Sequence, residues 1–201
     1  MADPLPQGPP PGPAASRPDP RRTRRMLLLI GAITVAPVLA SYGFYYFGPR
    51  DARVNYGTLL PTEPAPALEG LAADGGRFRL ADLSGRWLLV VPVAGRCDAV
   101  CERSLYATRQ ARTMQGKEQD RVVRVLLVPD GEAPGAALLE QHPGLVVARV
   151  APAAQAALPE GGTGIYLVDP LGNLVLQYPA DPDIKGVSKD LVRLLKASGI
   201  G

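Results

Sequence analysis

The sequence predicts an α/β fold, in which helices cover a mostly central sheet, preceded by a single transmembrane helix. Apolar runs typical of strands alternate with segments of helical periodicity between residues 87 and 197, which predicts the sheet and its helices. Residues 26–47 contain no charged side chain, and about 20 apolar residues are enough to cross the hydrocarbon core as a helix. A chain of 201 residues suits one domain with accessory segments.

The N-terminal residues 1–25 combine a proline-rich tail with a basic cluster. Eight of the first 20 residues are proline, which predicts a disordered segment. Four arginines then lie directly before the apolar run, and such clusters stay on the cytoplasmic side of a membrane. The chain is therefore expected to cross the inner membrane once. Its N-terminus would be cytoplasmic, and its C-terminal domain would lie in the periplasm or an equivalent intermembrane space.

Two other interpretations of the apolar run remain open. Val38-Leu39-Ala40 could be cleaved by signal peptidase, and Thr23-Arg24-Arg25-Met26-Leu27 resembles a twin-arginine signal. The apolar run continues past Ala40, which favours an uncleaved anchor. All three interpretations place the C-terminal domain on the same side of the membrane.

Residues 48–68 are expected to form a stiff linker, because they contain four prolines. The folded domain should then occupy residues 69–201. It is expected to begin with a small hairpin over 68–83, in which Asp74-Gly75-Gly76 supplies the turn.

The remaining elements follow from apolar runs and helical spacing. Trp87–Val93 is apolar on both faces, as in a central strand that is covered on both sides. Further strands are expected over 122–128 and 145–150, and a hairpin over 164–178. Helices are expected from the cysteine pair to about 116, over 133–141 and 153–158, and from 184 or 188 to 197.

The net charge of +3 is concentrated at the N-terminus. Residues 1–50 contain six arginines and two aspartates, which leaves the rest of the chain with a net charge of −1. A folded part that is nearly neutral has no electrostatic footprint for nucleic acid. We therefore expect no nucleic-acid partner.

The only two cysteines, Cys97 and Cys101, lie where the first strong strand gives way to a helix. Residues four apart on a helix share one face, with Cα atoms roughly 6 Å apart along the axis, which is compatible with a disulfide. Free amides at a helix start and Arg96 would stabilise a thiolate, whereas Asp98 and Glu102 would oppose it.

The pair admits three interpretations: a reactive dithiol, a Cu(I) site, or a static disulfide. A disulfide that closes a loop of about five residues contributes little to stability, because the loop is short. The spacing therefore favours a functional pair over a structural one.

Several segments resemble the Sco/SenC family of copper chaperones. They are FRLADLSGRWLLV at 78–90, the CxxxC pair, IYLVDPLG at 165–172, and NYGTLLP at 55–61. The resemblance implies a thioredoxin-like fold and copper ligation by Cys97 and Cys101. It also implies a role in assembling the copper centre of cytochrome c oxidase. The partner would be an oxidase subunit or another copper or thiol assembly factor.

The chain departs from the family pattern at three places. Asp98 and Glu102 stand where Sco proteins usually have prolines. The family's histidine ligand would fall near Gly161, where this chain has none, and its only histidine, His142, is expected in a surface turn. The loop Gly161–Gly164 also lacks the proline that thioredoxin-type enzymes place opposite their cysteines.

The leading prediction is a membrane-anchored, thioredoxin-like protein that assists cytochrome c oxidase assembly. It would act by Cu(I) delivery, by thiol–disulfide exchange, or by both. Cys97 is expected to be the more reactive thiol and Cys101 the resolving one. Two alternatives remain: a metal-free thiol–disulfide oxidoreductase, and a non-catalytic assembly module with a static disulfide.

Overall fold

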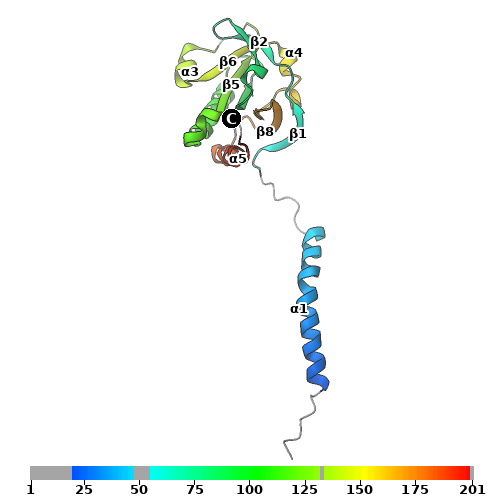
Figure 1. The fold of residues 1–201 in the computed structure, drawn as a ribbon. Coiled ribbons are helices and arrows are strands. Elements are labelled where there is room, and N and C mark those ends of the chain that lie inside the picture. The colour runs from blue at the N-terminus through cyan, green and yellow to red at the C-terminus, as the bar shows by residue number, and fades with distance from the viewer. Residues whose placement is uncertain (1–19, 48–54, 132–133, 200–201) are drawn as a thin grey trace, which may run out of the picture. The chain divides into compact units, whose positions relative to one another are not determined.

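The computed structural model describes residues 20–47, 55–131 and 134–199 (Figure 1). The chain divides into two compact units, with the boundary between Ala52 and Arg53. The expected disordered tail over residues 1–19 and residues 48–54 of the expected linker lie outside the described residues.

The first unit contains one long helix, α1, Pro20–Phe47. Its stretch Arg24–Gly43 is long and apolar enough to cross a membrane, and none of that stretch is buried inside the protein. The helix includes the expected span of 26–47 and begins earlier, at Pro20, so it also includes the basic cluster. Pro37 lies inside it, as Pro is tolerated within transmembrane helices. Length and composition therefore agree with a single membrane-spanning helix.

The second unit is built on an eight-stranded mixed sheet with the order β1-β8-β7-β4-β5-β6-β2-β3. Strands β4, β5 and β6 are parallel to one another, and all other neighbours pair antiparallel. The strands are β1 Thr58–Pro64, β2 Glu69–Ala72, β3 Arg77–Arg79, β4 Trp87–Pro92, β5 Val122–Val128, β6 Leu145–Val150, β7 Ile165–Val168 and β8 Asn173–Tyr178.

Helices cover the sheet and complete two cores. The α-helices are α2 Ala99–Thr113, α3 Ala136–Gln141, α4 Pro152–Gln155 and α5 Ile184–Ala197, and the 3-10 helices are η1 Leu80–Leu83, η2 Gly116–Arg121 and η3 Pro159–Gly161. Side chains of α2 and α5 pack on one core, which includes Leu105 and Leu191. The second core collects side chains from η1 and from the segments before β2 and after α4.

The alternation of strands and helices predicted from the sequence is confirmed in the second unit. All six residues of β4 and all seven of β5 are buried, as the apolar run of β4 and the run of β5, apolar apart from Arg124, indicate. Antiparallel β2 and β3 form the expected hairpin, and β7 and β8 form the second. The cysteine pair follows β4, at the edge where the parallel strands end.

Strand β1 corrects the expected linker. It lies within residues 48–68 and pairs with β8 at one edge of the sheet, with an irregularity between Leu59 and Glu63. Six of its seven residues are exposed. An exposed edge strand with two prolines lacks the apolar alternation by which strands are recognised, so composition alone indicated a linker.

Candidate functional site

The two cysteines form a disulfide across the start of helix α2. Their Cα atoms lie 5.2 Å apart. Cys101 lies in the first turn of α2, whereas Cys97 precedes Asp98, which is the N-cap residue. The pair therefore straddles the start of α2. The four-residue spacing predicts instead that both cysteines lie on one face of a helix. Asp98, between them, has an extended backbone.

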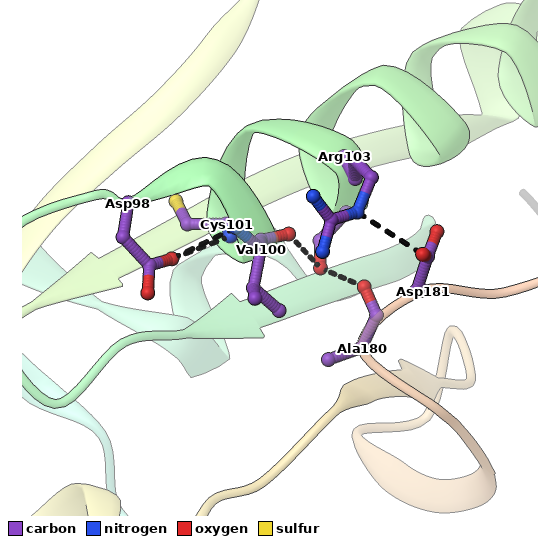
Figure 2. Close-up of polar contacts among 7 residues, drawn as sticks. Asp98, Val100, Cys101, Arg103, Ala180 and Asp181 are labelled. Atoms are coloured by element: carbon purple, nitrogen blue, oxygen red, sulfur yellow. Dashed lines mark hydrogen bonds and ion pairs between the residues drawn. The ribbon is translucent and has the colours of Figure 1, made fainter.

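Asp98 caps helix α2 at the disulfide (Figure 2). Its Oδ1 atom accepts hydrogen bonds from the backbone amides of Val100 at 3.0 Å and Cys101 at 2.9 Å. These amides are among the helix-start donors that would otherwise stabilise a thiolate. The sequence signal was available, because aspartate directly before a helix is a preferred N-cap.

The two sulfur-bearing residues differ in exposure. Cys101 is 4% exposed and belongs to the core beneath α2. Cys97 is half-buried and packs against the same core from outside. An attacking thiolate must approach a disulfide sulfur directly, so access favours Cys97.

A groove of about 360 Å³ lies beside the disulfide. One side is formed by the segment after β4 and the first turns of α2, including Cys101. The other side is formed by Gly162, Thr163 and Gly164, together with Ala180. The slot in which the Sco resemblance would place a histidine therefore lies in a loop that borders this groove, and the loop presents glycine and threonine there.

The loop before β7 requires glycine at Gly164. Its φ is +87°, and a Cβ added there would lie 2.3 Å from the carbonyl oxygen of Tyr178. The loop is also held from β8, because the Gln177 amide donates to the Thr163 carbonyl and to the Glu160 carboxylate, each at 3.0 Å. Glu160 has a left-handed φ of 52°. The far wall of the groove is therefore a fixed turn.

The segment between β8 and α5 is attached to α2 (Figure 2). The Ser104 hydroxyl lies within hydrogen-bonding distance of the carbonyl oxygens of Val100 and Ala180. The Arg103 guanidinium donates from Nε to Asp181 at 3.0 Å. These contacts fix Ala180 at the groove opposite the first turn of α2.

His142 is buried, which corrects its expected place in a surface turn. It is 5% exposed, and its Nδ1 atom has no hydrogen-bond partner among the described residues. Burial lowers the pKa of His142, and the charges of Arg124 and Arg109 lower it further. Arg124 lies on β5, is itself buried, and donates to the carbonyl of Pro143 at 2.6 Å. Burial lowers the pKa of Arg124 to about 10.

His142 does not complete a metal site. Among residues 20–47, 55–131 and 134–199, no group of three or more His, Cys, Asp or Glu side chains is arranged to hold a metal ion. The sulfur atoms of Cys97 and Cys101 are bonded to each other in this structure, so copper ligation by the pair stays a prediction. Two thiolates suit the soft Cu(I) ion better than Cu(II).

A family model described as transmembrane-like, thioredoxin-like, C-terminal domain matches residues 87–198, more than half of the chain. The chain belongs to this thioredoxin-like family. The matched region begins at β4 and ends just after α5, so it includes both cysteines and the groove. No curated protein matches the chain significantly.

Solved structures with the same fold include several Sco proteins. Yeast Sco1 with copper bound matches with a TM-score of 0.56 and 18% identity, over 69% of this chain and 96% of that one. BsSco, described as a Sco-family cytochrome c oxidase assembly protein with a disulfide switch, matches with a TM-score of 0.52 and 15% identity, over 68% and 93%. The thioredoxin domain of a thiol-disulfide oxidoreductase from Bacteroides vulgatus matches with a TM-score of 0.51 and 16% identity, over 68% and 99%.

These structural matches confirm the predicted thioredoxin-like fold. They also agree with the resemblance to Sco/SenC proteins that segments of the sequence indicated. At sequence identities of 15–18%, the similarity to these structures shows a shared fold and nothing further.

Proposed function

We propose that this chain is a membrane-anchored thioredoxin-like protein that assists cytochrome c oxidase assembly through Cys97 and Cys101. One observation carries the proposal: a disulfide lies at the start of α2 with one sulfur-bearing residue half-buried, one buried, and a groove beside them. The oxidised pair would exchange with thiols of a partner, and the reduced pair would carry Cu(I) as cargo.

The Sco proteins of the same fold support this assignment. Yeast Sco1 has been solved with copper bound, and BsSco is described as an oxidase assembly protein with a disulfide switch. The partner we propose is an oxidase subunit or another copper or thiol assembly factor. The basic cluster before the apolar stretch of α1 supports a cytoplasmic N-terminus in the inner membrane and a periplasmic domain.

Exchange follows the ordinary chemistry of disulfides. A partner thiolate attacks the sulfur of Cys97, the Cys97–Cys101 bond breaks, and Cys101 leaves as a thiolate that takes up a proton. A second partner thiol then displaces Cys97 from the mixed disulfide. The partner loses two electrons and two protons, and this chain gains them as two thiols. In the reverse direction Cys97 attacks first and Cys101 resolves the mixed disulfide.

Cu(I) would bind the reduced pair through the two sulfur atoms. The groove wall at Gly162, Thr163 and Gly164 adds no soft ligand. We therefore expect two-coordinate Cu(I) and weak binding of Cu(II), which favours nitrogen and oxygen ligands. Low coordination also suits a cargo ion that must pass to an acceptor.

Anaerobic titration tests the copper half of this proposal. The reduced chain should take up one equivalent of Cu(I) in the presence of a small-thiol competitor, and the C97S and C101S variants should not. If the reduced chain does not bind Cu(I) more tightly than the competitor does, the proposed copper role is contradicted.

A metal-free thiol–disulfide oxidoreductase is the second candidate. Two observations favour it. Among the described residues no group of three or more His, Cys, Asp or Glu side chains could hold a metal ion, and the fold is shared with the thiol-disulfide oxidoreductase from Bacteroides vulgatus. This candidate predicts that exchange persists while competitive Cu(I) binding is absent.

A further inference from the structure

Helix α5 carries positive charge that the proposed redox chemistry does not use. Three of the four lysines in the chain lie on it: Lys185, Lys189 and Lys196. Lys185, Lys189 and Arg193 recur every four residues, so they share one face of the helix. Lys185 and Lys189 are exposed, and the Arg193 side chain is 39% exposed. We call these three residues the basic stripe.

Two acidic residues, Asp183 and Asp190, lie beside the basic stripe, and both are engaged by backbone amides. Asp190, the one acidic residue of α5, is 1% exposed and accepts from the backbone amides of Tyr56 at 3.1 Å and Gly57 at 2.9 Å. Its contact with Arg193 is long, at 3.8 Å. Asp183 caps the helix start. Within the described ranges, Lys185 and Lys189 form no ion pair, so the stripe presents its charge outward.

The chain enters the folded unit beside this stripe. Asp190 holds the backbone of Tyr56 and Gly57, and the Tyr56 hydroxyl accepts from the backbone amide of Asp183 at 2.8 Å. Tyr56 also stacks on Tyr178, with ring centroids 6.1 Å apart. Asn55 and Tyr56 line a hollow of about 390 Å³ together with the three residues of the basic stripe, Gly186 and the acidic Asp183 and Asp190.

The sequence between the anchor and the folded unit is short. Helix α1 ends at Phe47, and Asn55 follows eight residues later. Eight residues reach at most about 29 Å when fully extended. A short tether gives the stripe a high effective concentration at the lipid surface.

We propose that the basic stripe of Lys185, Lys189 and Arg193 docks on the anionic phospholipid headgroups of the membrane that holds the anchor. This inference rests on the proposed membrane anchoring and is independent of the copper or redox chemistry. Lysine and arginine near an anionic leaflet are attracted to it, and the attraction fades within a Debye length. Docking would give the folded unit a preferred orientation on the membrane.

Lysine labelling of the full chain in nanodiscs tests the proposal. Discs of phosphatidylcholine alone are compared with discs that also contain phosphatidylglycerol, and reaction with an amine-reactive ester is read by mass spectrometry. Lys185 and Lys189 should react about fivefold more slowly in the anionic discs, and high salt should remove the difference. The fourth lysine, Lys117 in η2, is the internal control and should react equally in both.

Substitutions, together with co-elution of the chain with the discs, distinguish failure of docking from failure of the membrane anchor. Arg193→Gln should move the reactivity of Lys185 and Lys189 in anionic discs toward the phosphatidylcholine value, whereas the exposed control Arg86→Gln should not. Equal reactivity in the two lipids would overturn the proposal and point to an acidic protein partner. Failure of the chain to co-elute with the discs would overturn the anchor itself. A C97S/C101S variant should keep the protection, which separates docking from the redox function.

Discussion

At the scale of single residues, Asp98 has two effects on the neighbouring disulfide that substitutions can separate. Its carboxylate caps α2 by accepting from the amides of Val100 and Cys101, and its negative charge lies beside Cys97. Both effects disfavour a thiolate in the reduced pair, because the amide donors are occupied and the nearby charge is of like sign. Asn caps helices as well as Asp but carries no charge.

We expect Asp98→Asn to make the reduction potential of the pair less negative by about 10 to 20 mV, with little loss of stability. Asp98→Ala should shift the potential in the same direction and also lower the free energy of unfolding by about 1 kcal/mol. Asp183 provides the control, because it caps α5 in the same way without contacting the disulfide. Redox titration of the three variants checks this, and an equal shift for Asp183→Asn would contradict it.

His142 should make stability depend on pH. Its pKa in the folded protein is lowered, chiefly by burial, so the unfolded chain binds the proton more readily. The stability contributed by neutral His142 is complete above about pH 6.5, the ordinary histidine pKa, and is lost as the pH falls toward the folded value. Urea denaturation at pH 7.5 and 5.5 should show a larger loss for the native chain than for His142→Gln. Equal losses would mean that burial does not hold this histidine neutral.

At the scale of elements, the loop before β7 determines what faces the cysteines. Gly164 combines a positive φ with a close approach to the backbone of Tyr178, whereas Gly161 has a positive φ of 69° but open space around its Cα. Gly164→Ala should therefore cost more stability than Gly161→Ala, about 2–4 kcal/mol against about 1–2. Equilibrium denaturation of both variants tests this, and equal costs would show that the overlap at Tyr178 is relieved easily.

The strands differ in how clearly the sequence predicts them. Strand β4 was predictable because it is buried on both faces, which requires an unbroken apolar run, and β5 was predictable because its run is apolar apart from the buried Arg124. Strand β1 was missed because an exposed edge strand is held mainly by backbone hydrogen bonds, which leave little trace in composition. The burial of His142 was missed because it arises from packing between parts of the chain far apart in sequence: Arg124 on β5 donates to the carbonyl of Pro143, the residue after His142.

At the scale of the whole molecule, the order of the strands from β2 onward, the order of the α-helices between them and the position of the cysteine pair followed from the sequence. The contacts between segments that are far apart in the chain could be found only from the structure. The groove joins the start of α2 to the loop at Gly162–Gly164 and to Ala180, and Asp190 joins α5 to the segment after the anchor. The contacts at the groove determine the surroundings of Cys97 and Cys101. The spacing of the two cysteines in the sequence indicates only that they can form a disulfide.

The reduction potential of the Cys97–Cys101 pair tests the central claim most directly. The full chain is equilibrated with buffers of reduced and oxidised thiol, and the dithiol fraction is measured by alkylation and mass spectrometry. We predict a midpoint above about −300 mV, in the range where disulfides exchange with partners. A midpoint well below that value would identify a static structural disulfide and contradict the proposed function.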